Sequence, residues 1–278
     1  MVGKINMSLP KRAHDRLLLG LKRYQPIFDA AKKRDVSESD TAVMIADFLA
    51  DVLGYAKYTE ITTEFAIRGT YCDLAVKIDD KLCFLIEVKA IGVDLKESHV
   101  KQAVDYAANK GCEWVMLTNG IVWRVYKIGF GQPITNLLVT EVDLLKHPYR
   151  HEALVDCFSS LSREGWTKEK ISDYLEQMQA TSRYTLAATL LSESVITQVR
   201  REIRRLFPGV KIDSEFIAKQ IKDEVLKREV VEGEAADTAS GTLRKLTRRI
   251  EKEREREKAR EDTAAPVPPE APTGSLDG

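Results

Sequence analysis

The spacing of apolar residues predicts that the chain opens with two helices. Residues 11–34 place apolar side chains at helical spacing beneath a basic outer face, although Pro26 lies inside the run and can split it. Residues 37–55 have a stronger helical pattern, for which Ser37 or Ser39 is a suitable N-cap. We therefore expect one basic helix and one more apolar helix before the first strand.

The hydrophobic period then changes to the alternation that is typical of strands. Three short runs rich in β-branched and aromatic residues precede a return to helical spacing over residues 95–110, which Gly111 ends. Two more apolar runs, WVMLT and IVWRVYKI, flank Asn119-Gly120, a dipeptide that indicates a hairpin in this context. The first three predicted strands are residues 60–67, 71–78 and 82–90.

From about residue 151 the pattern is helical throughout, so the order of elements predicts an α/β core at about 35–145 followed by an all-helical region. Residues 231–242 predict a linker, and residues 243–261 predict a highly charged helix. The tail from residue 263 is rich in proline, which predicts disorder. The candidate helices of the helical region are residues 151–164, 167–180, 183–206 and 213–230.

Composition and charge narrow the class of protein. The chain carries 43 basic and 43 acidic side chains, and this zero net charge excludes a polybasic nucleic-acid coat. Nine basic but only three acidic residues lie within residues 1–35, which predicts a basic N-terminal arm. No apolar run is long enough for a membrane span or a secretory signal, so we expect a cytoplasmic protein without membrane contact.

Charged residues on the predicted strand 82–90 are the first sign of chemistry. One face of this strand is apolar throughout, whereas the other changes from Cys83 and Leu85 to Glu87 and Lys89. An isolated buried ion costs several kcal/mol, roughly, so these charges need a metal, a counter-charge or water. Open α/β sheets place ligand sites near such strand ends.

The preceding strand offers a second carboxylate. If Asp79-Asp80-Lys81 is a three-residue hairpin loop, Leu74 pairs with Ile86 and Asp73 lies opposite Glu87. A two-residue loop shifts the register by one and sets Asp73 against Ile86 instead. Two adjacent carboxylates suit a hard cation such as Mg²⁺ or Mn²⁺, unless one of them stays protonated.

These three charged groups supply the chemistry of phosphodiester hydrolysis. A cation between Asp73 and Glu87 can activate water and offset charge in the transition state, and Lys89 can orient or deprotonate that water. A surface salt bridge is the alternative interpretation of the same residues. The strand context and its apolar flanks favour the site.

Asp73 followed by Glu87-Val88-Lys89 within FLIEVKA resembles the core of PD-(D/E)XK nucleases. Over roughly residues 35–130 the chain is more specifically similar to the N-terminal nuclease domain of type I restriction enzyme R subunits. Further elements of the resemblance, in the same order along the chain, are Asp40-Thr41, Asp47, Leu53-Gly54-Tyr55, Gln102, Tyr106 and LTNGIVWRVY at 117–126.

The resemblance implies a restriction-endonuclease-like core, in which helices flank a central mixed sheet. It implies Mg²⁺ or Mn²⁺ bound by Asp73, Glu87 and the Val88 carbonyl, with Lys89 as the catalytic lysine. The implied role of Asp40 is that of the first-helix acid near the metal, with Glu38 and Asp47 as competitors. The resemblance also places Gln102 and Tyr106 against the site, where they contact the DNA backbone or the scissile region.

The expected protein is a Mg²⁺-dependent endodeoxyribonuclease of restriction or defence type. The sequence contains no P-loop, so we expect no ATP-driven motor of its own. DNA is the expected partner, with a homo-oligomer or other subunits of a defence system as further possibilities. One alternative is a catalytically silent nuclease-fold module that binds DNA or protein, and another is a scaffold built through residues 151–261.

A group of arginines in the helical region is a candidate DNA contact. Arg200, Arg201, Arg204 and Arg205 share one helix face and predict either a phosphate-contacting stripe or a solvated face. The expected organisation is a basic arm at 1–34, a nuclease-like domain at 35–148, a helical region at 149–230, a linker and charged helix at 231–262 and a disordered tail at 263–278.

Overall fold

The chain divides into two compact units in the computed structural model, which describes residues 9–67 and 70–263. The N-terminal unit is Met1–Met178 and the C-terminal unit is Gln179–Gly278. The predicted disordered tail lies outside the described residues from residue 264 onward, as do the first eight residues of the predicted basic arm. Among the described residues, no helix is long and apolar enough to cross a membrane.

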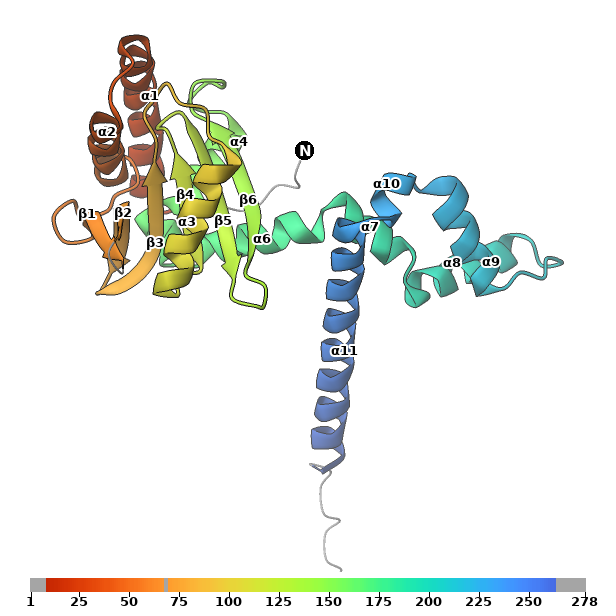
Figure 1. Cartoon of the computed structure of the whole chain (residues 1–278). Helices are drawn as coiled ribbons and strands as arrows, with labels where there is room; N and C mark the ends of the chain where they lie inside the picture. The colour runs from red at the N-terminus through yellow and green to blue at the C-terminus, as the bar shows by residue number, and fades with distance from the viewer. Residues whose placement is uncertain (1–8, 68–69, 264–278) are drawn as a thin grey trace, which may run out of the picture. The chain divides into compact units, whose positions relative to one another are not determined.

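A mixed six-stranded sheet forms the centre of the N-terminal unit, with the strands in sequence order (Figure 1). All neighbouring strands are antiparallel except β3 and β4, which run parallel. Helix α3, Glu97–Lys110, provides the crossover that this parallel pair requires. The strands are β1 Ile61–Ile67, β2 Thr70–Ile78, β3 Lys81–Val88, β4 Trp114–Thr118, β5 Val122–Gly129 and β6 Thr135–Asp143.

Strand β6 is the element that the hydrophobic pattern did not predict. Its first four residues, from Thr135 to Leu138, are exposed at the edge of the sheet. Only its second half buries apolar side chains, Val139 and Val142. A strand that is half exposed has no continuous alternation, and its pairing with β5 is visible only in the folded chain.

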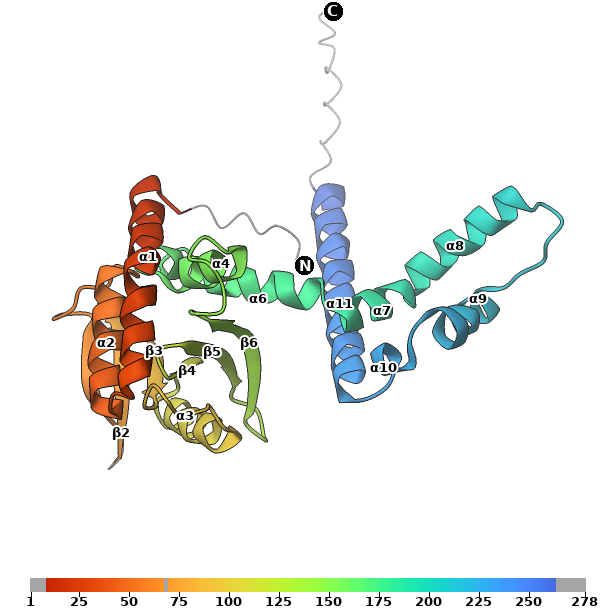
Figure 2. The ribbon, with the colours of Figure 1, turned by 90° about the horizontal axis from the view of Figure 1, so that it is seen from above.

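Helices cover both faces of the sheet (Figures 1 and 2). Three helices share one hydrophobic core with the sheet: α1 (Lys11–Arg34), α2 (Glu38–Asp51) and α4 (Glu152–Leu161). Helix α3 packs on the other face and forms a second, smaller core. The prediction of a mixed sheet flanked by helices is confirmed.

Aromatic rings occupy the centre of the larger core. Phe48 of α2 is fully buried, and its ring centroid lies 5.2–6.0 Å from those of Tyr24, Phe28, Trp123 and Phe158. These rings come from α1, α2, β5 and α4, so Phe48 joins three helices to the sheet. Edge-to-face and tilted ring pairs at such distances stabilise a core beyond the area they bury.

Helix α1 is part of this core, whereas the sequence predicted residues 1–34 as a separate arm. Leu17, Leu21 and Phe28 have no exposed surface, and only the outer face of the helix is basic. Pro26 does not split the helix. Proline has no N–H, so the carbonyl four residues earlier in the helix receives no hydrogen bond from it. Because Pro26 is exposed, it lies on the side of the helix where water can take the place of that hydrogen bond.

The N-terminal unit extends to Met178 rather than ending at residue 148. Leu154 and Phe158 of α4 are fully buried, and Arg163 forms an ion pair with Glu60 at 2.8 Å. These contacts bind the start of the predicted helical region to the sheet. The unit ends with α5, Arg163–Trp166, and most of α6, Lys170–Ala180.

The C-terminal unit is helical, as predicted, but its boundaries differ. The expected helix 183–206 is broken before Ser192, and the expected linker 231–242 is helical from Glu234. Ala236 is buried and α11 packs along α7, which explains why a segment of low hydrophobicity is helical. The elements are α7 Arg183–Leu190, α8 Glu193–Leu206, α9 Ser214–Gln220, the π-helical turn η1 Ile221–Val225, α10 Arg228–Val231 and α11 Glu234–Thr263.

Candidate active site

The β2–β3 hairpin sets the register on which the candidate site depends. Its loop has two residues, Asp79 and Asp80, both with positive φ. The sequence left loops of two and three residues open, and the pairing of Leu74 with Ile86 was expected for three. The register shifts between Val76 and Lys77, however, and this irregularity compensates for the shorter loop. Leu74 therefore pairs with Ile86, as predicted.

Asp73 directly precedes Leu74 on β2 and Glu87 directly follows Ile86 on β3, so in this antiparallel arrangement both carboxylates lie at the same end of the Leu74–Ile86 pair. The backbone N–H of Val88 donates a 2.7 Å hydrogen bond to Oδ2 of Asp73, which joins the carboxylate of β2 to the end of β3. The backbone N–H of Lys89 donates to the carbonyl of Thr118 at 2.9 Å, so β4 holds the chain just beyond the strand. The site is thus built on three neighbouring strands.

Glu87 is a buried carboxylate with one unsatisfied oxygen. Its side chain is 2% exposed, and Oε1 accepts a 2.6 Å hydrogen bond from Nζ of Lys89. Oε2 is buried without any hydrogen-bond partner. Burial raises the pKa of Glu87 to about 7, and the charge of Asp73 adds to this, while the hydrogen bond from Lys89 opposes it.

Lys89 is held between carboxylates. Besides Glu87, its Nζ approaches Oε1 of Glu38 at 3.8 Å. Burial alone lowers the pKa of this lysine, but the hydrogen bond to Glu87 and the charges of Glu87, Glu38 and Asp73 outweigh burial and raise it. Lys89 is therefore an ammonium at neutral pH, which makes it a donor of charge and hydrogen bonds rather than a base.

Asp73 experiences the same electrostatic environment. Burial raises its pKa, whereas the Val88 N–H and the ammonium of Lys89 act in the opposite direction. The acidic side chain of Glu38 contributes to the raised pKa values of both Asp73 and Glu87. These four residues consequently form one electrostatic group.

Helix α2 presents Glu38, rather than Asp40, to this group. Asp40 accepts a 2.8 Å hydrogen bond from the hydroxyl of Ser37, the N-cap of α2, and is exposed. Asp47 is ion-paired with Lys57. Helix geometry explains the choice, because Glu38 and Asp40 lie two positions apart and point in different directions.

Gln102 and Tyr106 lie together on α3. The side-chain amide of Gln102 donates a 3.0 Å hydrogen bond to the hydroxyl of Tyr106, and both residues line a shallow surface cavity of about 370 Å³. No direct contact joins this pair to the carboxylates. Burial and then the charge of Lys89 lower the pKa of His99, at the start of α3.

Asn119 is a positioning residue that the sequence indicated only as part of a hairpin. Its Oδ1 accepts hydrogen bonds from the backbone of Ile121 and Val122, which shapes the turn between β4 and β5. Its Nδ2 donates to the carbonyl of Val93 at 2.9 Å. Asn119 thereby anchors the loop that follows Lys89.

The predicted arginines lie in the other unit, on α8. Arg200 is partly buried and Arg201 is exposed, whereas Arg204 donates to the carbonyl of Ile212 at 3.1 Å. Arg205 forms an ion pair with Glu202. The phosphate-contacting role of these residues stays a prediction.

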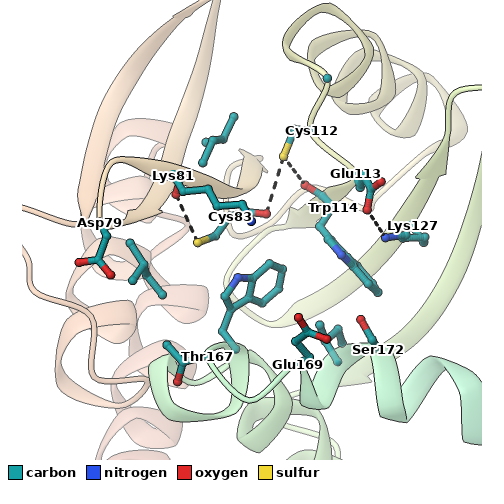
Figure 3. A pocket seen from close by; sticks show the side chains of 15 residues that line it. Asp79, Lys81, Cys83, Cys112, Glu113, Trp114, Lys127, Thr167, Glu169 and Ser172 are labelled. Atoms are coloured by element: carbon teal, nitrogen blue, oxygen red, sulfur yellow. Dashed lines mark hydrogen bonds and ion pairs between the residues drawn. The ribbon is translucent and has the colours of Figure 1, made fainter.

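A separate cavity of about 750 Å³ lies at the opposite end of β3 (Figure 3). Lys81 and Cys83 line it together with Trp114, over whose ring Nζ of Lys127 lies at 4.5 Å from the centroid. Glu113 pairs with Lys127 at the rim. None of the predicted site residues lines this cavity.

The site offers some, but not all, of the oxygen ligands that a hard cation needs. Among the described residues, no group of three or more His, Cys, Asp or Glu side chains is arranged to hold a metal ion. Asp73 and Glu87 nonetheless offer carboxylate oxygens, and the buried Oε2 of Glu87 lacks any partner in the protein. Oxygen donors of this kind are those that Mg²⁺ and Mn²⁺ prefer.

Fold and site together define an α/β domain with an Asp–Glu–Lys group at the ends of adjacent strands. Residues 41–140 match the family model of the Type I restriction enzyme R protein N terminus (HSDR_N). This confirms the similarity to the N-terminal domain of type I restriction enzyme R subunits, and the matched range includes Asp73, Glu87 and Lys89. No curated protein and no solved structure matches the chain.

The raised pKa of Glu87 predicts a stability change that needs no nuclease assay. Because the folded pKa of about 7 exceeds the ordinary value of 4.5, Glu87 favours folding below pH 4.5, and this contribution is lost as the pH rises through 7. Because glutamine does not titrate, we expect the stability of Glu87→Gln relative to the wild type to rise by about 1–3 kcal/mol between pH 5 and pH 8, on top of a pH-independent cost of removing the counter-charge of Lys89. Urea unfolding followed by tryptophan fluorescence measures this, since all three tryptophans lie in the N-terminal unit.

Asp15→Asn is the matched control, because Asp15 is exposed on α1. Its stability relative to the wild type should not change between the two pH values. A Glu87→Gln variant whose stability relative to the wild type does not rise between pH 5 and pH 8 would contradict the raised pKa of Glu87.

Proposed function

We propose that the N-terminal unit is a metal-dependent nuclease of restriction or defence type that hydrolyses DNA phosphodiester bonds. The observation that carries this proposal is the buried Glu87 carboxylate, with an unsatisfied oxygen, between Asp73 and Lys89. A purely structural role does not account for this oxygen, because among the described residues of the N-terminal unit it is the one buried side-chain N or O atom without a hydrogen-bond partner. The sheet is, in this proposal, a PD-(D/E)XK nuclease core.

Asp73, Glu87 and the Val88 carbonyl would hold Mg²⁺ or Mn²⁺. Glu38, which is 49% exposed, takes the position predicted for Asp40 and has room to turn toward the ion. When bound, the ion supplies positive charge that offsets the negative charge of the scissile phosphate. The Val88 N–H keeps Asp73 oriented toward the same point.

Lys89 supplies the second positive charge. Its ammonium donates hydrogen bonds to the attacking water or to a phosphate oxygen, and Glu87 fixes its direction. Since the pKa of Lys89 is raised, proton removal from the water does not fall to this lysine in the state described. Its contribution is charge stabilisation and orientation.

The DNA contacts extend beyond the reacting group. Gln102 and Tyr106 contribute amide and hydroxyl donors on α3 that reach the phosphate backbone. Other subunits of a defence system are further partners.

A second function has two observations in its favour. The described residues hold no three-residue metal cluster, and Lys89 already neutralises Glu87 within the protein. A nuclease fold whose site binds no metal ion would bind DNA or a protein partner without cutting. The two functions differ in their response to divalent ions.

Cleavage of supercoiled plasmid with Mg²⁺, with Mn²⁺ and with EDTA separates them. A circular substrate has no ends, so its conversion to open or linear forms reports endonuclease activity. We expect cleavage with either ion, none with EDTA, and a loss of at least about 10²-fold for Asp73→Asn. Asp15→Asn should cut like the wild type, and DNA binding without cleavage under every ion would establish the silent module instead.

A further inference from the structure

The C-terminal unit buries too little apolar surface to be stable alone. Among residues 179–256, whose side-chain exposure the structure describes, the buried hydrophobic side chains are only Ala187, Ile196, Ile217 and Ala236. Chains of this length normally bury more than half of their surface to offset the loss of conformational entropy. The large apolar side chains that remain 45–71% exposed on and between α8, α9 and η1 are Leu206, Phe207, Val210, Phe216 and Val225.

Two adjacent segments of this unit carry opposite charge. Residues 198–211 contain five basic and one acidic side chain, whereas residues 213–237 contain eight acidic and four basic ones. Among the described residues, no ion pair joins one segment to the other. The charges of both segments are therefore complementary but unpaired with each other within one chain.

We propose that helices α8–α10 form a two-fold interface between two copies of this chain. The basic segment, 198–211, of each copy meets the acidic segment, 213–237, of the other, and Phe207 and Phe216 become buried between them. A two-fold interface uses the same patch on both copies, so each copy must contribute both charges. Here the two segments adjoin in the chain, and α8 contacts α9, which contacts η1. Residues 193–231 are numerous enough for the roughly 20–30 residues a side of a standard interface.

A second copy fits this surface better than DNA does. DNA attracts only the basic segment, and its phosphates repel the acidic segment that follows directly in the chain. Exposed phenylalanine and valine side chains gain little from a phosphate backbone but gain much from an apolar partner. A partner that has apolar, acidic and basic side chains on one surface complements all three features of this surface: the basic segment, the acidic segment and the exposed apolar side chains.

The test uses charge reversal in the full-length chain, without DNA or divalent ions. Sedimentation velocity at about 1–100 µM should show the wild type as a dimer. Reversing the basic segment with Arg201→Glu and Arg204→Glu, or the acidic segment with Asp223→Lys and Glu224→Lys, should weaken association at least about tenfold. Mixing the two reversed proteins should restore a dimer, because both contacts of the two-fold interface are then complementary again.

Two further variants complete the design. Phe207→Ser with Phe216→Ser should also weaken association, whereas Lys22→Glu with Lys32→Glu on α1 should leave it unchanged. A wild type that is monomeric throughout, reversed variants that associate normally, or a mixture that stays dissociated would each overturn the proposal. Loss of DNA binding with unchanged association would instead assign the arginines to DNA, and none of these outcomes depends on cleavage.

Discussion

Replacing Lys89 with glutamine should reduce the rate of DNA cleavage by about 10²–10³-fold, with DNA affinity retained. The variant keeps a hydrogen-bond donor for Glu87 but removes the ammonium that stabilises charge at the phosphate. The effect should therefore fall on the rate at saturating DNA rather than on binding. Single-turnover cleavage of plasmid, with binding measured separately by anisotropy, distinguishes the two.

Glutamine is preferred to alanine at this position because of burial. Lys89→Ala would also abolish cutting, but it leaves the buried Glu87 carboxylate without a counter-charge, at a cost of several kcal/mol, roughly. Lys32→Gln on α1 is the matched control, since Lys32 is exposed. This variant should cleave DNA at the wild-type rate. Cleavage by Lys89→Gln at the wild-type rate would remove Lys89 from the proposed site.

Truncation of Phe48 should have the largest effect on stability. Phe48→Ala deletes a fully buried ring that contacts four others, so we expect a loss of about 3–5 kcal/mol in the free energy of unfolding. Val43→Ala on the same helix is the control, because Val43 is 61% exposed and should change stability by less than about 0.5 kcal/mol. Urea denaturation monitored by tryptophan fluorescence measures both.

The Phe48 result also tests whether α1 and α2 are integral to the fold. Phe48 contacts rings on α1 and α4 as well as Trp123 of the sheet, so its loss should weaken one cooperative unit. If α1 were an independent arm, Phe48→Ala would produce a small change confined to a separate transition. Such a result would contradict the common core described here.

The sequence alone determined the elements whose signals are local. Strands β2 and β3 follow from alternation and turn residues, and the pairing of Leu74 with Ile86 follows from matching their apolar faces. That pairing survives a two-residue loop because an irregularity restores the register that buries the apolar side chains. The grouping of Asp73, Glu87 and Lys89 was therefore predictable from the chain.

The tertiary structure decided what depends on distant partners. Strand β6 exists because β5 pairs with it, and α1 is part of the core because α2 and α4 bury its apolar side chains. Sequence spacing could not rank Glu38 above Asp40, since only the packing of α2 against the sheet determines which carboxylate faces Lys89. Local patterns encode elements and their faces, whereas contacts between elements far apart in the chain become definite only when the whole core is assembled.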